Sequence, residues 1–585
     1  MNFRTTKRHW FFPTLASATF LIFFPNGSVA RETSPQLVYR QLTCHRYAVG
    51  DPVIPKEVRE ARNRPAASEA EGPGGVRWKA GPQGLAEISR SGQTKIWTPK
   101  DGLPILPITS IAVGPDGWVW MGTPDGAICF RPRAREGERW FYFWGRRYLA
   151  DNAVLNVVAE PHRAWIETRA GTSLIDFKKY TLEEKSALFI KDLHQCNDRY
   201  GLVAEARLLR PGDLSSCTPV SNDNDGLWTS MYIASECFRY AVTQSPEALR
   251  NAQNSLKGLL RLVWITGIPG FPARSYVRRG QDVGTGKDWH WTPDGMWKWE
   301  GDTSSDELVG HFFVYGIAYD LLPPTDELDR EAVRNAAVNI ANNLREHGWN
   351  LAGYGGRITR WGKFSPAYFK TPEGQDQAPL NALELLAYLR VAYHVSGNRS
   401  FLDDYHRLID QEGYLRHVTE GFSHLPPLTA FNFSDEELAY LCFYPLLKYE
   451  HDPGLRKQYQ SAMSELWHHD EAEHNPLWDY IYEMGTGANN YDAQGALNTL
   501  ERIQMDMIHW TAHNSQRLDL SLTRLPNEDG HRQSLKAIPP DERCTSKWNG
   551  NPFGLDCDGG GNGVDDGTLF LLPYWLGRYD KLLQP

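Results

Sequence analysis

Acidic, histidine and tyrosine side chains gather at one predicted helix start, where their spacing could support acid–base chemistry. Asp306 and Glu307 lie in the first turn, because Glu307 follows a serine at capping-box spacing and an apolar stripe comes after it. Glu307, His311 and Tyr315 recur every four residues, so they share one helical face. That face either lines a pocket or forms a satisfied polar network in the core.

A second polar group precedes another predicted helix. Asn222, Asp223 and Asp225 stand directly before it, and Trp228 lies in its first turn. A single side chain of this kind is enough to cap a helix. The sequence therefore leaves two roles open for this group, helix capping and contact with a ligand.

Two carboxyl groups on different helix starts can cleave a glycosidic bond, one as a protonated acid and the other in its ionised form. We predict this hydrolysis, with catalytic residues from the two helix starts: Asp225, Asp306, Glu307, His311 and Tyr315. Elimination beside a uronate is the alternative reaction, since His290, His311 or Tyr315 could act as its base. Arg274 would then neutralise the sugar carboxylate.

Aromatic and cationic side chains near these helix starts are suited to holding a sugar. Trp289, His290 and Trp291 lie in a loop rich in Gly, Pro and Asp, which cannot bury so much ring surface by itself. Arg274 and Arg360 lie in two further loops, and guanidinium groups bind carboxylates and sulfates through paired hydrogen bonds. We predict a polysaccharide or oligosaccharide substrate, uronic or sulfated glycans included, held by Asn222, Asp223, Trp228, Arg274, Trp289, His290, Trp291 and Arg360.

The first 30 residues have the order of an export signal. Arg4, Lys7 and Arg8 precede an apolar run, and Ser-Val-Ala ends the segment. The run is too short to span a bilayer comfortably, and no later segment approaches the length that a spanning helix needs. We therefore predict that residues 1–30 are a signal peptide and that the protein is exported, periplasmic or extracellular, without an integral membrane segment.

The composition limits the partners and cofactors. The formal net charge of -9, without a long run of one sign, argues against nucleic acid, whose binding needs a basic face. Eight cysteines in an exported chain permit disulfides, and Cys544 and Cys557 bracket a loop that a bridge could close. The Asp-rich segment 556–566 offers oxygen ligands for calcium but lacks the order of an EF-hand. No nucleotide or zinc-protease motif occurs, so we predict no metal and no cofactor.

Residues 75–178 contain a repeat that predicts antiparallel strands. Trp78, Trp120 and Trp165 occupy equivalent positions, each followed by a glycine six residues later. The segment 101–130, which begins DGLP, resembles the repeats of two-component-regulator β-propellers. The resemblance implies a partial β-propeller-like module, and three repeats cannot close a ring alone, so we expect the module to dock on the domain that follows. Residues 31–74 lack the period and are predicted to be a leader or linker.

The remaining chain, residues 179–585, has a helical pattern. About twelve segments show helical periodicity or capping signals, and Gly- and Pro-containing loops join most of them. Consecutive antiparallel pairs over this length predict a mainly α fold, an (α/α)6 toroid, whereas a helical solenoid would show a constant period. Long loops at 266–304 and 511–567 suit a toroid with a cleft.

The predicted toroid resembles the architecture of many glycoside hydrolases and polysaccharide lyases, which implies a carbohydrate-active enzyme. The competing class is an exported protein that only binds a glycan or acts as a sensor. The absence of a recognisable signalling segment and the size of the helical part favour the enzyme.

Overall fold

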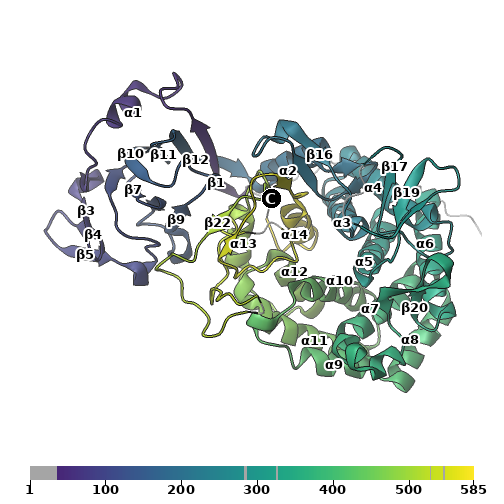
Figure 1. The fold of residues 1–585 in the computed structure, drawn as a ribbon. Helices are drawn as coiled ribbons and strands as arrows, with labels where there is room; N and C mark the ends of the chain where they lie inside the picture. Colours follow the sequence, from purple (N-terminus) through teal and green to yellow (C-terminus); the bar gives the residue numbers. More distant parts are fainter. Residues whose placement is uncertain (1–35, 282–285, 324–326, 528, 545–546, 585) are drawn as a thin grey trace, which may run out of the picture.

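The two sequence patterns separate into two regions of the molecule (Figure 1). Sheets built from the repeat segment gather on one side, and helices from residue 182 onward gather on the other. The computed structural model describes residues 36–584 apart from 282–285, 324–326, 528 and 545–546. The predicted signal peptide, residues 1–30, therefore lies outside the described residues. Within the described residues, none of the helices combines the length and apolarity needed to span a bilayer.

The sequence repeats form four-stranded antiparallel sheets. The first sheet contains β2 (Glu69–Glu71), β3 (Arg77–Gly81), β4 (Gly84–Ile88) and β5 (Thr94–Trp97), and the second contains β6 (Ser110–Val113), β7 (Val119–Thr123), β8 (Gly126–Phe130) and β9 (Trp140–Phe143). Trp78, Trp120 and Trp165 are buried in equivalent strands. Gly84 begins β4 with φ +151°, and a Cβ there would lie 2.0 Å from the carbonyl oxygen of Trp97, so only glycine fits. The expected β module is therefore present, while its propeller assignment stays a prediction.

The third sheet takes its outer strand from the beginning of the chain. It has the order β1 (Val38–Tyr47), β12 (Thr172–Thr181), β11 (Arg163–Thr168) and β10 (Val154–Glu160). The segment 31–74 thus contributes β1, α1 (Lys56–Ala61) and β2 to the module, so the sheets begin well before the sequence repeat does. The repeat could not reveal β1, because its partner strand lies far away in the sequence.

Six helices form a closed inner ring in the helical domain. Each contacts the next in the order α3 (Asp225–Thr243), α5 (Ser305–Leu321), α7 (Pro372–Ser396), α10 (Phe433–Tyr449), α12 (Pro476–Thr486) and α14 (Thr568–Tyr579), and α14 returns to α3. These helices are apolar on several faces because neighbours surround them. In α5, for example, every residue from Glu307 to Ala318 is buried.

The outer helices alternate with the inner ones along the chain and cover them from outside. They are α2 (Leu182–Cys196), α4 (Pro246–Ile265), α6 (Glu327–Glu346), α8 (Arg399–Glu412) with α9 (Tyr414–Phe422), α11 (Pro453–Asp470) and α13 (Ala493–Arg502). An outer helix buries only one stripe: α8 buries Phe401, Tyr405 and Leu408, which recur at i, i+4 and i+7. This alternation is the arrangement expected of an (α/α)6 toroid.

Three helices differ most from the ranges that the helical pattern predicts, which are Leu182–Leu209, Leu380–Val395 and Ala493–Trp510. The helix predicted from Leu182 to Leu209 ends at Cys196, where short strands take over before Pro211. The helix predicted up to Trp510 ends at Arg502. In contrast, α7 begins already at Pro372 and continues through Pro379, although proline usually ends a helix. Tertiary packing overrides local signals at these ends.

Nearly all long loops lie at one end of the ring, because they lead from an outer helix into the next inner helix. They carry the small strands β13 (Asp198–Arg199), β14 (Leu202–Val203), β15 (Ala206–Leu208), β16 (Cys217–Pro219), β17 (Ser275–Arg278), β18 (Trp289–Trp291), β19 (Trp297–Glu300), β20 (Asn350–Ala352), β21 (Ile358–Lys363), β22 (Ala512–His513), β23 (Asp556–Cys557) and β24 (Gly563–Val564). Connections from inner to outer helices are shorter. The loop end of the ring is therefore where a site can be built.

A buried lysine joins the β module to the helical domain. Lys185 in α2 donates to Gln41 of β1 at 2.8 Å and to the carbonyl oxygens of Leu500 and Ile503 at 2.8 and 2.7 Å. The last carbonyls of a helix lack partners within their own helix, so the ammonium group satisfies the end of α13. The β module is thus docked through its first strand.

A second group of contacts fixes the loop before α14 between the two regions. Arg502 pairs with Asp541 at 2.5 Å and with Glu542 at 2.8 Å. Glu542 also accepts the backbone N–H of Tyr142 in β9 at 3.1 Å. Disulfides link Cys196 to Cys217 and Cys544 to Cys557, the second being the bridge that the sequence suggests.

Candidate functional site

A cavity of about 460 Å³ opens at the loop end of the ring, beside the start of α3. Strands β15, β16, β17 and β19 contribute its walls together with the segment before α3. Its charged lining residues are Arg199, Glu205, Arg207, Asp223 and Glu300. Carboxyl groups therefore outnumber guanidinium groups in this cavity.

Glu300 is the most perturbed acid of the cavity. It ends β19, whose pairing with β17 and β18 fixes its backbone, and only 6% of the residue is exposed. Burial raises the pKa of Glu300 to about 7; Arg274 opposes the rise, and Asp223 adds to it. No hydrogen bond or ion pair reaches its carboxyl group from the described part of the chain. Glu300 can therefore carry a proton near neutral pH and release it to a bound ligand.

Asp223 provides an exposed carboxylate in the same cavity. Its side chain is 62% exposed, and Arg274 Nη2 lies 3.4 Å from its Oδ2. Arg274 also donates to the side-chain oxygen of Asn224 at 2.9 Å and to the carbonyl oxygen of Asp302 at 3.1 Å. The sequence predicts that Arg274 binds a sugar. In the structure its guanidinium joins the loop before α3 to the loop before α5 through these hydrogen bonds.

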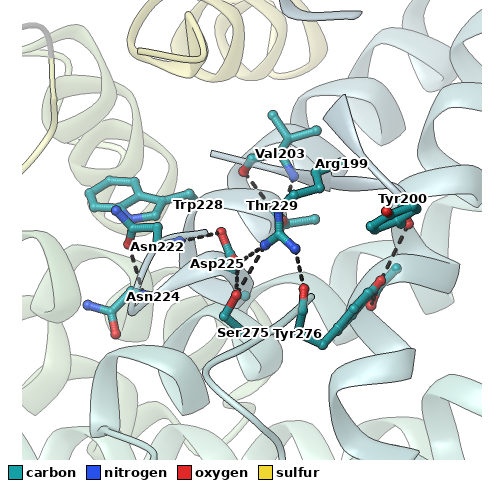
Figure 2. A network of polar contacts seen from close by, with 12 residues as sticks. Arg199, Tyr200, Val203, Asn222, Asn224, Asp225, Trp228, Thr229, Ser275 and Tyr276 are labelled. Carbon is teal, nitrogen blue, oxygen red and sulfur yellow. Dashed lines mark hydrogen bonds and ion pairs between the residues drawn. The ribbon is translucent and has the colours of Figure 1, made fainter. Parts of the chain in front are cut away.

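Asp225 is buried and forms an ion pair with Arg199, which Figure 2 shows. Its carboxylate contacts the guanidinium of Arg199 and the hydroxyl of Ser275, and Arg199 also donates to the carbonyl oxygen of Tyr276. Burial raises the pKa of Asp225 to about 6, while Arg199 opposes the rise. This network holds the start of α3 against β17, a structural role that differs from the helix capping that the sequence left open.

Glu307, His311 and Tyr315 meet on one face of α5, as their spacing indicates, but that face points into the ring. All three are fully buried. Glu307 accepts the backbone N–H of Gly226 at 2.9 Å, so it caps the neighbouring helix α3 rather than its own. His311 Nδ1 lies 2.7 Å from the hydroxyl of Tyr315, and burial lowers the pKa of His311 to about 3. The three residues therefore form a polar network in the core, but it is not fully satisfied, because Glu307 Oε2 and His311 Nε2 have no hydrogen-bond partner among the described residues.

Asp306 is the one half-buried acid among the five predicted catalytic residues, and it belongs to a separate acidic group. The group consists of Asp306 on α5, Glu384 on α7, and Asp435 and Glu437 on α10. Burial, with a further contribution from Asp306, raises the pKa of Asp435 to about 6 and those of Glu384 and Glu437 well above the usual value. Both carboxyl oxygens of Glu384 and of Glu437 lack a hydrogen-bond partner within the described residues.

Asn222 and Trp228 join the cavity to the first turn of α3. Asn222 lines the cavity, and its side-chain oxygen accepts the indole N–H of Trp228 at 3.2 Å. The ammonium group of Lys547 lies 4.7 Å from the centre of the Trp228 ring. Lys547 also pairs with Glu205, so the loop before α14 closes over the side of the cavity.

The predicted sugar-binding aromatics lie on the small sheet of β17, β19 and β18. Trp291 is 49% exposed and is covered by the cationic groups of Arg279 and Lys298 at 5.1 and 4.7 Å. His290 and Trp289 are half-buried in the same strand. Arg360 lies on β21, with its guanidinium 4.5 Å from the ring of Trp361. These residues are therefore outside the cavity of about 460 Å³.

The Asp-rich segment 556–566 is used by local structure. Asp565 Oδ2 lies 2.6 Å from His509 Nε2, Asp566 accepts the backbone N–H of Thr568 at 2.8 Å, and Asp556 accepts that of Asn514 at 2.8 Å. Among the described residues no group of three or more His, Cys, Asp or Glu side chains is arranged to hold a metal ion.

Glu300 and Glu205 are the carboxyl groups of the cavity that sequence analysis missed. Glu300 ends the Trp-Lys-Trp-Glu segment, only a few residues before the helix start that drew attention. A signal was available, since a glutamate in a strand of aromatics must either face solvent or line a polar space. Glu205 gave no such signal, because its position depends on a pairing between β15 and β24 from opposite ends of the helical domain.

Comparisons with known proteins leave the family open. No family model matches the chain, and no curated protein does. A thermostable endoglucanase from Alicyclobacillus acidocaldarius aligns over 94% of this chain and 100% of its own, with 12% identity and a TM-score of 0.37. Bacteroides ovatus GH9 aligns over 88% of this chain and 98% of its own, with 10% identity and a TM-score of 0.33. The GH family 9 endoglucanase J30, as a triple mutant, aligns over 76% of this chain and 91% of its own, with 11% identity and a TM-score of 0.34. Scores this low do not match individual residues, so the site rests on its own geometry.

Proposed function

We propose that the protein is a glycoside hydrolase in which Glu300 is the acid and Asp223 the second carboxylate. One observation carries the proposal: a buried carboxyl group with a pKa of about 7, which has no hydrogen-bond or ion-pair partner among the described residues, lines a cavity that an exposed carboxylate also lines. Enzymes that cleave glycosidic bonds by acid–base catalysis typically use two carboxyl groups, of which the surroundings keep one protonated and leave the other ionised.

The reaction follows from the two protonation states. Protonated Glu300 donates its proton to the oxygen of the glycosidic bond as the bond to the anomeric carbon breaks. Asp223 accepts a proton from the water whose oxygen forms the new bond to that carbon. A later proton exchange with solvent restores both groups. Arg274 holds the loop that carries Asp223, and β17 and β18 hold the strand that carries Glu300.

The His/Tyr elimination has less support. His311 and Tyr315 are fully buried and contact each other, so neither can reach a sugar without unpacking the ring, and the third candidate base, His290, lies outside the lining of the cavity that contains Glu300. The purely binding alternative is tested by the assay below. The two disulfides favour the predicted export, because such bonds persist in oxidising compartments.

The test is a screen of the purified protein against neutral, uronic and sulfated polysaccharides. A hydrolase releases reducing ends, a lyase also produces the ultraviolet absorbance of an unsaturated uronate, and a binding protein does neither. On the cleaved glycan, Glu300→Gln and Asp223→Asn should each lower kcat by at least about 100-fold. Unchanged folding, checked by circular dichroism, would show that the loss is chemical.

Two further variants complete the design. Glu465→Gln changes an exposed glutamate on α11 and should leave kcat unchanged. Asp306→Asn tests the catalytic role predicted from the sequence. Turnover close to that of the wild type in Glu300→Gln would overturn the assignment of the acid, and loss only in Asp306→Asn would move the site to the acidic group of α5, α7 and α10.

A further inference from the structure

A second cavity, of about 330 Å³, lies on the other side of the strand pair that carries Glu300. Its charged lining residues are Lys287, Asp288, Asp302 and Arg357. The two cavities share a wall, since Gly286 and Glu300 line the first while Asp288 and Asp302 line the second. The wall is closed by a hydrogen bond of 2.8 Å from the backbone N–H of Gly301 to the carbonyl oxygen of Asp288.

Tyr354 presents a free aromatic face in this second cavity. Tyr354 is 54% exposed, although aromatic side chains of this size usually bury most of their surface. The other face is supported, because the ring of His290 stacks on it at 4.2 Å and that of Trp299 lies 4.5 Å beyond His290. A rigid aromatic ring that is backed on one side and open on the other suits the apolar face of a sugar ring.

The polar groups around Tyr354 are held in place before any ligand arrives. Asp302 has φ +49°, and it accepts the backbone N–H of Arg360 at 2.9 Å and a guanidinium hydrogen bond of Arg274 at 3.1 Å. Arg357 lies 3.5 Å from Asp288, and its side chain is 68% exposed. The turn that carries Tyr354 is fixed by a 2.8 Å hydrogen bond from the N–H of Gly353 to the carbonyl oxygen of Arg357.

The charges of the second cavity cancel. Two cations, Lys287 and Arg357, face two carboxylates, Asp288 and Asp302, so the formal lining charge is zero. A cavity of this kind has donors and acceptors for hydroxyl groups but no excess cation for a carboxylate or sulfate.

We propose that the second cavity binds an uncharged sugar unit of the same glycan chain that is cleaved beside Glu300, with Tyr354 as its stacking platform. This proposal rests on the proposed hydrolase function and adds its substrate class: a neutral oligosaccharide or polysaccharide that crosses the wall between the two cavities. Sugar hydroxyls bind to Asp302 and Arg357, and the unit on Tyr354 is remote from the bond that breaks.

The test uses binding, so that it does not depend on turnover. Glu300→Gln protein, alone and combined with Tyr354→Ala, is applied to an array of neutral, uronic and sulfated oligosaccharides of graded length. We expect neutral chains to bind, and longer chains to bind more tightly than short ones. Tyr354→Ala should lower the affinity for the longer chains roughly tenfold and leave the affinity for the shortest chains unchanged. Trp361→Ala, an exposed aromatic of the same hairpin outside the cavity lining, is the matched control.

Three results would overturn the inference: selective binding of uronic or sulfated chains, an equal loss at all lengths in Tyr354→Ala, or no binding to any glycan. Failure of the hydrolase proposal is seen separately, as retained turnover in Glu300→Gln. The two proposals can also separate. If length-dependent binding disappears in Tyr354→Ala while Glu300→Gln retains turnover, the sugar subsite at Tyr354 is supported and the catalytic acid is a residue other than Glu300.

Discussion

Lys547 forms an ion pair with Glu205 across a sequence separation of 342 residues. Glu205 lines the cavity of about 460 Å³, and Lys547 comes from the loop before α14. The pair therefore joins the wall of the proposed active site to a loop that also contacts the β module, where the carbonyl oxygen of Asp541 accepts the hydroxyl of Tyr148 and Glu542 accepts the backbone N–H of Tyr142.

Replacing this lysine should affect substrate binding more than chemistry. We expect Lys547→Met to raise KM roughly two- to fivefold with little change in kcat, since a partly exposed ion pair contributes about 0.5–1 kcal/mol. Lys547→Arg keeps the charge and should stay close to the wild type. Steady-state kinetics separate the two constants, and a fall in kcat alone would place Lys547 in the chemical step instead.

The pH dependence of kcat/KM should report the acid. Because Glu300 has a pKa of about 7 and acts in its protonated form, kcat/KM should fall as pH rises through about 7. The negative charge of Asp288 disfavours ionised Glu300 and so raises its pKa. Asp288→Asn should therefore move the alkaline fall to lower pH. A profile with the same alkaline limb in both proteins would show that another group controls it.

Asp225→Asn and Glu307→Gln should lower the free energy of unfolding by different amounts. Asp225→Asn leaves Arg199, whose side chain is 5% exposed, without its counter-charge, and breaking a buried pair typically costs about 3–5 kcal/mol. Burial raises the pKa of Glu307 well above its usual value, and the amide oxygen of Glu307→Gln can still accept the N–H of Gly226. We expect this change to cost about 1 kcal/mol or less. Urea unfolding followed by tryptophan fluorescence measures both.

The turnover of Glu307→Gln tests whether Glu307 has a catalytic role. Glu307→Gln should retain activity, because its side chain has no access to a sugar. A fully folded Glu307→Gln protein without turnover would instead restore the catalytic role that the sequence predicts for Glu307.

The acids of α7 and α10 should make the protein less stable at alkaline pH. Glu437 has a pKa far above its value in the unfolded chain, so the folded state holds a proton that the unfolded state has released. This penalty is absent below about pH 4 and grows as pH rises toward the folded pKa. Glu437→Gln should therefore raise the free energy of unfolding at pH 8.

Thermal unfolding at pH 5 and pH 8 checks the sign. The wild type should lose stability between the two values, and Glu437→Gln should lose less. Glu465→Gln, at an exposed position, should follow the wild type. Equal loss in Glu437→Gln would mean that this carboxyl group is ionised or paired in the folded protein.

Much of the architecture could be predicted from local patterns. The shared spacing of Trp78, Trp120 and Trp165 predicts equivalent strands, and all three are buried in equivalent places. The four-residue spacing of Glu307 and His311 correctly puts them on one face of α5. Local spacing cannot say whether such a face points to the ring interior or to a cleft, because that depends on the neighbours α3 and α7.

The cavity residues show what local patterns cannot provide. Glu300 faces the cavity because β19 lies between β17 and β18, and Asp225 is neutralised by Arg199 from a different loop. Both facts arise from pairings between segments that are separated in the sequence. A carboxylate before a helix has the same local signature whether it caps the helix, pairs with a buried arginine or meets a substrate.

The pairing of β1 with β12 has a consequence for how the chain is made. Val38 stands opposite Thr181, so β1 stays without this partner strand until the ribosome has nearly completed the third sheet. Meanwhile its exposed edge can attract other chains. A clone that starts at the sequence repeat, without residues 38–47, would leave β12 as a bare edge and would be prone to aggregate.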